Sequence, residues 1–370
     1  MAPRTTPPFR ADHVGSLLRP PDLLRARADH AAGTITAAQL QAAEDDAVRD
    51  AVRMQEEIGL RSATDGEFRR AEWHTDFIKR LGGIREAAAA TPVSVLGGEK
   101  PATYQAHGTE VTGKVHLAEP IFADHFSFLA ATVSTAVPKL TIPSPSMAHF
   151  RADISGSGYA DKDEFRADLA AAYAAEIAAL AALGCRYLQL DDTLFAFMND
   201  PAWRERAAAS GIDPDREHEI NLAVINQALA NRPAGLTVTV HMCRGNYRSL
   251  WFSSGGYDFV AEAVFSGLQV DGFFLEYDDD RSGTFEPLRF VPADKLVVLG
   301  LVTTKTPALE SKDTLKRRVD EAARYIDPDR LCLSPQCGFA STVEGNALTQ
   351  AQQRAKLTLV VETAAELWGS

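Results

Sequence analysis

The sequence predicts an α/β protein that folds as one (β/α)8 TIM barrel, with residues 1–370 forming a single domain. Short apolar runs typical of buried strands alternate with helical segments of about 10–20 residues, and this alternation predicts a parallel sheet. Polar side chains also stand at the carboxyl ends of most expected strands, which is the rim where a barrel carries its active site. An open doubly wound sheet is the alternative, but no Gly-x-Gly-x-x-Gly motif follows the first strand.

The first two strands each end in a candidate functional side chain. The first is expected over Phe9–Ser16, a short run that stops at Gly-Ser and brings Ser16 to the rim. A helix is expected over about 37–59, because apolar residues recur at helical spacing and a glycine follows as a typical stop. The second strand is expected over 62–67 and ends in Glu67.

Residues 84–136 are the least regular part of the sequence and are interpreted as an insertion that carries hairpins. They contain a Gly97-Gly98 pair, several prolines and a segment, Val111–Leu117, in which apolar and polar residues alternate. Such alternation indicates a strand that is buried on one face only. About nine strand candidates compete for eight barrel positions, so residues 111–117 are assigned to the insertion.

Beyond the insertion, strands and helices alternate to the end of the chain. The further strands are expected over residues 139–145, 186–192, 236–243, 272–276, 295–302 and 330–338. The further helices are expected over residues 163–183, 217–231, 257–266, 311–326 and 348–368. The polar side chains at the strand ends are Ser16, Glu67, Ser144, Asp191, His241, Glu276 and Lys305.

The overall composition argues against several classes of function. The formal net charge is −12 and the isoelectric point is about 5.3, which disfavours a surface for nucleic acid. No apolar run approaches the roughly 20 residues that a membrane span needs, and the first residues lack the apolar core of a secretory signal. Four cysteines in 370 residues are too few for a disulfide framework, so a reducing, cytoplasmic location is expected.

Three of the expected strands end in side chains that bind zinc. The run Leu236–Cys243 places His241 and Cys243 two residues apart, so their side chains point to the same face. The next runs end in Glu276 and, within a Pro-Gln-Cys-Gly turn, in Cys337. Imidazole, thiolate and carboxylate are the ligands of tetrahedral zinc, so these four side chains predict one Zn²⁺ site at the rim.

The predicted ligand set favours chemistry at sulfur. Two thiolates, one imidazole and one carboxylate leave a bound Zn²⁺ with a net charge near −1. That charge weakens the activation of water, and it suits an incoming thiol that is held as a reactive thiolate at neutral pH. The predicted reaction is alkyl transfer to sulfur, with a zinc hydrolase as a weaker alternative.

Other interpretations of these residues stay open. Buried cysteines often pack as small hydrophobic residues, and this is the better explanation for Cys185 and Cys332, which lie in strand-like runs. A structural zinc site is disfavoured, because such sites use closely spaced cysteine pairs and these ligands spread over about a hundred residues. Asp192 and Asp278–Asp280 are interpreted as solvated loop charges and receive no role.

Taken together, these motifs resemble the cobalamin-independent methionine synthase family. The segments similar to its zinc ligands are His241-Met-Cys243, Glu276 and Pro335-Gln-Cys337-Gly. Its Ile-Gly-Ser, His-Gly-Glu and Gln-Ile-Asp-Glu motifs are matched by His13-Val-Gly-Ser16, Asp65-Gly-Glu67-Phe and Gln189-Leu-Asp191-Asp192. The matches run from residue 13 to residue 338 in the family's order. The opening Phe-Arg-Ala-Asp-His-Val-Gly-Ser resembles the short, single-barrel branch, which lacks the additional N-terminal barrel of the long enzymes.

The resemblance implies a barrel with zinc at its carboxyl-terminal face and an S-methyltransferase reaction. The methyl group would pass to the thiol of homocysteine and give methionine, a step of methionine biosynthesis. The resemblance also implies that Glu67 and Asp191 bind the ammonium group of homocysteine, and two anions suit one cation. Ser16 and its backbone N–H are similar to the loop that binds the carboxylate.

The sequence departs from the long enzymes where they bind the methyl donor. They carry a tryptophan after the fourth strand that contacts folate, and this region here reads Ile142-Pro-Ser-Pro-Ser146. They carry a catalytic histidine after the eighth strand, and Thr303-Thr-Lys305-Thr stands here instead. Lys305 is thus a candidate proton donor or anion contact, although lysine is not an equivalent acid. Three methyl donors remain compatible with the sequence: methyltetrahydrofolate, a methylated corrinoid protein or another methylated small molecule.

Three functions fit these observations to different degrees. The first is a zinc-dependent homocysteine S-methyltransferase. The second is a relative that alkylates another thiol, such as an epoxide-opening transferase acting on coenzyme M. A sulfonated thiol calls for Arg or Lys, so the carboxylates of Glu67 and Asp191 favour the first function. The third is a non-catalytic zinc- or thiol-binding protein that has lost the donor site.

Overall fold

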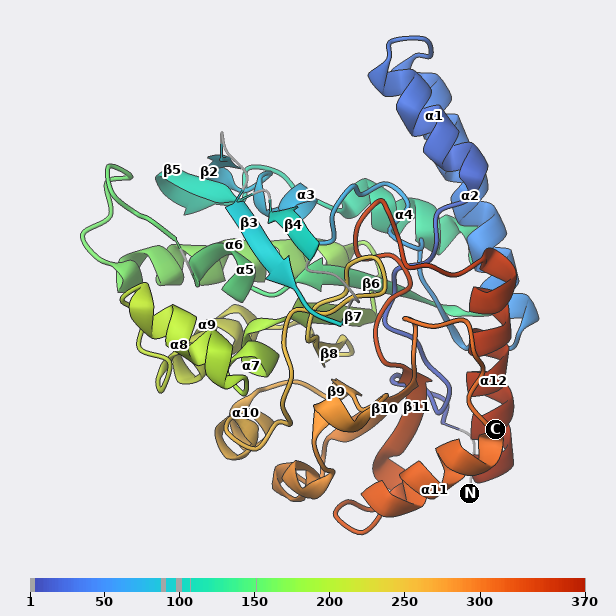
Figure 1. Ribbon diagram of the computed structural model, residues 1–370. Helices are drawn as coiled ribbons and strands as arrows, with labels where there is room; N and C mark the ends of the chain where they lie inside the picture. The colour runs from blue at the N-terminus through green and yellow to red at the C-terminus, as the bar shows by residue number, and fades with distance from the viewer. Residues whose placement is uncertain (1–3, 88–90, 98–101, 107, 151, 370) are drawn as a thin grey trace.

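A parallel sheet of seven strands forms the centre of the molecule and curls round on itself (Figure 1). The computed structural model describes residues 4–87, 91–97, 102–106, 108–150 and 152–369. In spatial order the strands are β1 (Ser62–Ala63), β6 (Val137–Pro143), β7 (Tyr187–Asp192), β8 (Thr237–Met242), β9 (Gly272–Glu276), β10 (Leu296–Val302) and β11 (Leu331–Pro335). Every neighbouring pair is parallel, which confirms the predicted TIM-barrel-like α/β class.

The segment 9–17 lies where the sequence predicts the first strand, against the free edge of β11. Asp12 N–H donates to Leu333 O at 3.0 Å, and Leu333 N–H donates to Arg10 O at 2.8 Å. Only one pair, Ala11 with Leu333, has the pairing of a strand, so the full strand predicted here is wrong in length. The Asp12 carboxylate accepts from backbone N–H groups of its own segment, which diverts them from a ladder.

The second predicted strand, 62–67, is also shorter in the structure, where β1 has two residues. Gly66 and Glu67 have φ angles of 65° and 59°, in the left-handed region that strands do not use. The turn they form presents Gly66 O to the Leu17 N–H, which donates to it at 3.1 Å. The N-terminal segment therefore connects both edges of the curled sheet and takes the eighth position of the barrel.

The insertion carries a hairpin, as predicted, within an outer pair of antiparallel strands. Its strand pairs are β2 (Gly82–Glu86) with β5 (Thr109–His116) and β3 (Thr91–Val95) with β4 (Ala102–Ala106), both antiparallel. The insertion is shorter than the predicted 84–136, because Ala123–Thr132 forms helix α4. This helix packs against β6 and against helix α2 (Ala37–Glu57), so it belongs to the barrel.

Helices cover the outside of the sheet, and α1 with the start of α2 projects away from it (Figure 1). The other predicted helices are α6 (Lys162–Ala182), α9 (Glu217–Leu229), α10 (Ala261–Gly267), α11 (Lys312–Ala322) and α12 (Gln350–Trp368). Helices that the sequence did not predict are α1 (Pro21–Ala31), α8 (Pro201–Ala209) and the short α3 (Thr75–Ile78), α5 (Ser146–His149) and α7 (Leu194–Phe197). Three 3-10 helices span Asp280–Ser282, Glu286–Phe290 and Pro328–Arg330.

The space between sheet and helices is filled by buried apolar side chains. Cys185 and Cys332 both lie within apolar clusters, which confirms that they pack as core residues. Within the described ranges, the helices are too short or too polar for any of them to cross a lipid bilayer.

Candidate metal centre

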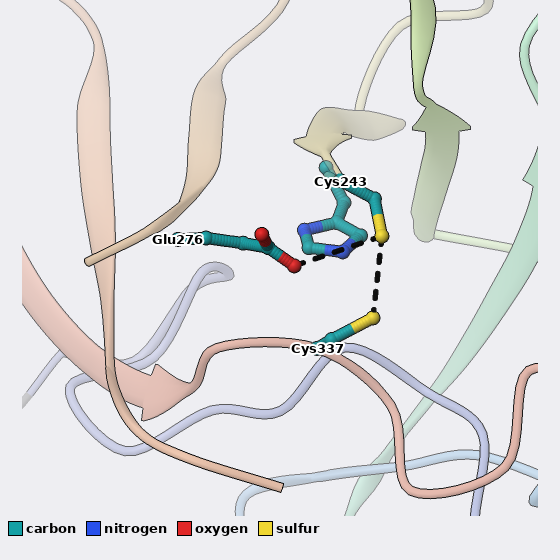
Figure 2. Close-up of side chains that lie close together, drawn as sticks. Cys243, Glu276 and Cys337 are labelled. Atoms are coloured by element: carbon teal, nitrogen blue, oxygen red, sulfur yellow. Dashed lines mark hydrogen bonds between the residues drawn. The ribbon is translucent and has the colours of Figure 1, made fainter. Parts of the chain in front are cut away.

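The four residues predicted as zinc ligands come together in the structure (Figure 2). One side-chain atom from each of His241, Cys243, Glu276 and Cys337 lies within 4.8 Å of the others, and all four residues are buried. Cys243 Sγ is 3.4 Å from Cys337 Sγ and 3.6 Å from Glu276 Oε1. Residues up to 96 positions apart in the sequence therefore share one small volume.

The ends of three strands on one side of the sheet, β8, β9 and β11, produce this convergence. His241 lies in β8 and Cys243 directly follows it, so the alternation of the strand turns both side chains to the same side. Glu276 is the last residue of β9, which pairs with β8, and Cys337 stands two residues beyond β11. Parallel strands present their carboxyl ends at one rim, so the topology itself assembles the cluster.

The cluster has the dimensions and the donors of a zinc site. A tetrahedral ion with Zn–S bonds of about 2.3 Å separates two sulfurs by about 3.8 Å, within a few tenths of an ångström of the 3.4 Å between Cys243 and Cys337. His241 Nδ1–H donates a hydrogen bond to Phe274 O at 3.3 Å. Because the ring proton is on Nδ1, the lone pair that can bind a metal is on Nε2. That Nε2 is buried and makes no regular hydrogen bond within the described residues. The residues present therefore fit a Zn²⁺ ion.

The electrostatics of the cluster also favour a cation. Burial lowers the pKa of His241, but Cys337, Asp191 and Glu276 outweigh burial and raise this pKa to about 8. Burial raises the pKa of Glu276, against the nearby charge of Lys305. Burial thus explains the shift of Glu276, whereas the acidic neighbours explain that of His241, and a divalent ion would favour the charged form of the Glu276 carboxylate.

Glu276 is oriented by groups behind it. Its Oε1 faces Cys243, whereas its Oε2 accepts from the Arg244 backbone N–H at 3.1 Å. The guanidinium groups of Arg244 and Arg281 lie 3.6 Å and 3.8 Å from the same Oε2. One carboxylate oxygen is thus held by the protein and the other is free for a metal.

Lys305 is buried behind the cluster rather than in the adjoining cavity. Its Nζ lies 3.8 Å from Asp278 Oδ2, and its charge is the one that lowers the pKa of Glu276 most. Asp278 is also paired with Arg281 at 3.1 Å, and its side chain is 1% exposed. The interpretation of Asp278 as a solvated loop charge is therefore wrong, while Asp279 and Asp280 are exposed as expected.

Asp192 was likewise interpreted as solvated, and the structure corrects this. The residue is fully buried. Its carboxylate accepts hydrogen bonds from the Ser144 and Ser146 hydroxyls, from Asn221 Nδ2 at 2.8 Å and from the Phe195 N–H at 2.9 Å. Asp192 thus fixes the loops that follow β6 and β7.

A cavity of about 220 Å³ opens beside the metal centre. His241, Cys243 and Cys337 form part of its wall. The three residues predicted to bind substrate, Ser16, Glu67 and Asp191, line the same cavity. The structure thus brings the predicted substrate residues next to three of the four candidate metal ligands.

Glu67 and Asp191 are buried carboxylates in this wall. Thr141 Oγ1 donates to Glu67 Oε1 at 2.9 Å, and Gln189 Nε2 donates to Asp191 Oδ1 at 2.7 Å. Glu67 Oε2 is buried without a hydrogen bond among the described residues, although Arg70 lies 3.7 Å away. Burial raises the pKa of both carboxyl groups, that of Asp191 to about 7. Such groups favour a cationic partner.

Ser16 is held against the turn that carries Cys337. Its carbonyl accepts from the Phe339 N–H at 2.9 Å, and its Oγ accepts from the Ala340 N–H at 3.4 Å. Gly338 allows this approach, because a Cβ there would lie 1.9 Å from Ser16 Oγ. The glycine in Pro-Gln-Cys-Gly thus serves the contact between the metal-ligand turn and the N-terminal loop.

No motif in the sequence indicates the aromatic part of the cavity wall. Its aromatic side chains come from segments that are far apart in the chain. In the sequence, each of these residues looks like an ordinary core residue. They include Trp73, Tyr104, Phe197, Trp203, Tyr247 and Phe252. We refer to these six side chains as the aromatic wall.

Fold and site together define a TIM-barrel-like α/β protein with a candidate metal centre of two thiols, an imidazole and a carboxylate at its carboxyl-terminal rim. The family model described as cobalamin-independent synthase, catalytic domain, matches residues 9–366. The chain therefore belongs to this family, which confirms the resemblance seen in its motifs and makes a methyltransferase the class of enzyme it represents.

Similar proteins agree with this assignment. The uncharacterized protein YxjG of Bacillus subtilis is 48% identical over 367 residues, covering 99% of this chain and 96% of its own. A methionine synthase of Sulfurisphaera tokodaii is 26% identical over 329 residues, covering 88% and 84%. A Listeria monocytogenes structure assigned as a vitamin-B12-independent methionine synthase has a TM-score of 0.79 at 36% identity and covers 99% and 100% of the two chains.

Proposed function

We propose that the protein is a zinc-dependent methyltransferase that transfers a methyl group to the thiol of homocysteine and forms methionine. The observation that carries this proposal is that two buried carboxylates line the same cavity as three of the four clustered metal-binding side chains. Membership of the methionine synthase family supports it. His241, Cys243, Glu276 and Cys337 would hold the zinc ion.

Bound zinc would supply thiol activation, by stabilising the substrate sulfur as a thiolate at neutral pH. The chain's own residues determine which thiol comes there. Glu67 and Asp191 offer two anionic partners to the ammonium group of an amino acid, and their burial makes that contact strong. Ser16 and the 338–340 turn offer polar groups to the carboxylate.

A sulfonated thiol such as coenzyme M fits this cavity less well. Among its described lining residues, none is Lys or Arg, so a sulfonate would be left beside Glu67 and Asp191 without a counter-charge. The same residues suit the zwitterion of homocysteine. We therefore place the alkylation of other thiols second.

Lys305 acts in this proposal as an electrostatic partner of Glu276 rather than as a proton donor to substrate. Its ammonium group pairs with Asp278 and lowers the pKa of Glu276, and it does not line the cavity. The proton-donor role stays a prediction. The four cysteines are free, which is consistent with the reducing cytoplasm that we propose as the location.

X-ray absorption at the zinc edge of the purified protein tests the proposal. Homocysteine should change the zinc spectrum by adding a sulfur neighbour, whereas serine, an amino acid without a thiol, should not. The zinc-loaded protein should also form methionine from homocysteine and a methyl donor. An unchanged zinc edge would refute the proposal, and a changed edge without turnover by any donor would favour a non-catalytic thiol-binding protein.

A further inference from the structure

The aromatic wall lines the same cavity as Glu67 and Asp191. Its rings lie close to one another. Tyr104 is 4.8 Å from Tyr247 and 5.9 Å from Phe252 between ring centroids, and Phe197 stacks on Trp203 at 4.3 Å. Trp203 Nε1 donates to Phe252 O at 2.7 Å, which joins the two groups of rings. The wall is thus a connected surface rather than scattered residues.

The aromatic wall stands beside the metal centre. Tyr247 and Phe252 belong to the loop that begins at the candidate ligand Cys243, and only three residues separate Cys243 from Tyr247. The loop folds back on itself, since Phe252 N–H donates to Arg244 O at 3.0 Å. A group held by these rings would therefore be near the sulfur ligands.

The insertion closes over this loop. Leu96, next to β3, forms an antiparallel bridge with Trp251, with N–H to O distances of 2.7 Å and 3.2 Å. Tyr104 of β4 donates its hydroxyl proton to Glu72, which fixes the ring over the cavity. The insertion thus contributes directly to the wall.

Acidic side chains outnumber Lys and Arg among the described residues that line the cavity. Glu67 and Asp191 line it, and Cys243 and Cys337 contribute thiols. Among the described lining residues no Lys or Arg is present to balance them. Aromatic faces carry negative potential and attract cations, most strongly when the contact is desolvated. A polyanion such as a folate with a glutamate tail would meet no compensating charge here.

We propose that the aromatic wall binds the methyl donor, and that this donor is a small onium cation, a sulfonium or a quaternary ammonium compound. The assignment rests on the proposed function, because it names the donor class for the same site. The size of the cavity agrees with it, since 220 Å³ lies below the roughly 300–1,000 Å³ of pockets for drug-sized ligands.

The transfer balances without a further reactant. The homocysteine thiol releases its proton to the surrounding water, and a lone pair of the resulting thiolate forms the new bond to the methyl carbon. The bond between this carbon and the positive sulfur or nitrogen of the donor breaks, and its electron pair stays on that atom. The donor leaves as a neutral sulfide or amine, so it needs no proton from the protein. This agrees with the position of Lys305 outside the cavity.

Binding of simple onium ions tests the wall apart from turnover. Trimethylsulfonium and tetramethylammonium should saturably change the tryptophan fluorescence of the zinc-loaded protein, while neutral tert-butanol should not. Tyr247→Leu and Phe252→Leu should each weaken binding about tenfold, and Tyr247→Phe, which keeps the ring, should change it by less than about threefold. Tyr325, which is 42% exposed, provides the control variant Tyr325→Leu with unchanged binding. Onium binding by Tyr247→Leu and Phe252→Leu that is as tight as binding by the unmutated protein would overturn the proposal.

A donor panel with homocysteine and zinc-loaded protein tests the reaction. Methionine should form from trimethylsulfonium or S-methylmethionine, or from glycine betaine, and these two arms distinguish a sulfonium from an ammonium donor. Methionine from triglutamyl methyltetrahydrofolate or methylcobalamin alone would overturn the donor assignment and leave the proposed function intact. A zinc edge that responds to homocysteine without methionine from any onium would also overturn it. A zinc-edge absorption spectrum that does not change when homocysteine is added would refute the proposed function itself.

Discussion

Position along a strand decides what a cysteine does in this chain. All four cysteines are buried. Cys332 lies inside β11, where burial raises its pKa to about 12. Cys337 lies two residues beyond the same strand, where its hydrogen bond with Cys243, and next that with His241, hold the pKa of the Cys337 thiol well below its usual range despite burial. Both thiols of the cluster, Cys243 and Cys337, lie beyond a strand end, whereas Cys332 lies inside a strand.

Replacing either thiol of the cluster should remove the metal. We expect Cys243→Ser and Cys337→Ser to lower zinc affinity at least about 100-fold, because loss of a ligand exceeds the effect of losing an outer contact. Metal content after dialysis measures this, with circular dichroism as the check on folding. The matched control is Cys332→Ala, because Cys332 is a buried cysteine outside the cluster. This variant should bind zinc as tightly as the unmutated protein. Full zinc in either serine variant would show that the substituted thiol is no ligand.

Asp191 should make amino-acid binding depend on pH. Burial raises its pKa to about 7, so the carboxylate that attracts an ammonium group is lost as the pH falls below 7. Methionine affinity of the metal-free protein should therefore rise about 25-fold between pH 5.5 and 7.5 and then level off. Calorimetric titration measures it, and methionine has no thiol proton to complicate the result.

Asp191→Asn is the control for this profile. It should bind methionine weakly and with a much flatter pH dependence. His241 also titrates near this range, with a pKa of about 8 to which Asp191 contributes, so this pKa should be lower in the variant. The difference between the two profiles thus reports Asp191 together with its effect on His241, and identical profiles would remove the role of Asp191 in binding the ammonium group.

The positions of the strand ends predict which side chains gather at the rim. They do not predict the hydrogen-bond and ion-pair partners of each side chain. The ligand pair His241 and Cys243 follows from two-residue alternation alone. The burial of Asp192 and Asp278 does not, because their partners come from other elements. Asn221 of α9 donates to the first, and Arg281 pairs with the second. Sequence spacing carries no information on such distant partners.

At the scale of elements, local signals predict some helices and miss others. Thr36 and Thr349 form capping boxes at the starts of α2 and α12, and both helices follow the predicted ranges. Helix α4 was missed within the irregular region. Its preceding N–H groups, at residues 121 and 122, donate to the carboxylate of Glu176 in α6. A helix start that depends on a side chain about fifty residues away leaves no local signature.

The loop after β8 depends on a glycine for its shape. Gly245 has a φ of 87°, and a Cβ at this position would lie 2.1 Å from Phe252 Cδ2 in the aromatic wall. Gly235, before β8, has a similar φ of 78° but nothing within 4 Å of the same point. Replacing either glycine by alanine should therefore strain the backbone to a similar degree. Only at Gly245 would the new Cβ also clash with a neighbouring side chain.

This difference predicts unequal effects of alanine. Gly235→Ala should lower the free energy of unfolding by about 1 kcal/mol through strain. Gly245→Ala should lose that amount and a further 1–3 kcal/mol or so from crowding of Phe252, unless the ring moves away. Denaturant titration measures both values. Equal losses would show that Phe252 does not pack on this glycine in solution.

For the whole molecule, the order of the barrel follows from the sequence, whereas its closure does not. Eight strand-like runs in chain order give the parallel arrangement with the hairpins set aside. The N-terminal segment, however, closes the barrel mainly through Asp12. Its carboxylate accepts from Tyr187 of β7 at 2.9 Å and from Ser62 of β1 at 3.0 Å, and Lys139 of β6 lies 3.3 Å away. Nothing in the run of apolar residues indicates that an aspartate organises it.

The Asp12–Lys139 pair predicts a large dependence of stability on one buried carboxylate. Both side chains are fully buried, so Asp12→Ala would leave an ammonium group in the barrel without its counter-charge. We expect a loss of about 3–5 kcal/mol in the free energy of unfolding. Asp329→Ala is the matched control, because Asp329 also pairs with the N-terminal segment, at 3.4 Å from Arg10, but is 62% exposed. Its loss should stay below about 1 kcal/mol.

The zinc content of the Asp12→Ala variant tests whether the metal centre depends on closure of the barrel. The ligands come from β8, β9 and the turn after β11, and none belongs to the segment that Asp12 holds. At a temperature where the Asp12→Ala variant is still folded, it should therefore retain full zinc. Reduced zinc in the folded variant would mean that the N-terminal segment also fixes the cluster, through the contact of Ser16 with the Cys337 turn. Equal stability of the two alanine variants would show instead that the barrel closes without Asp12.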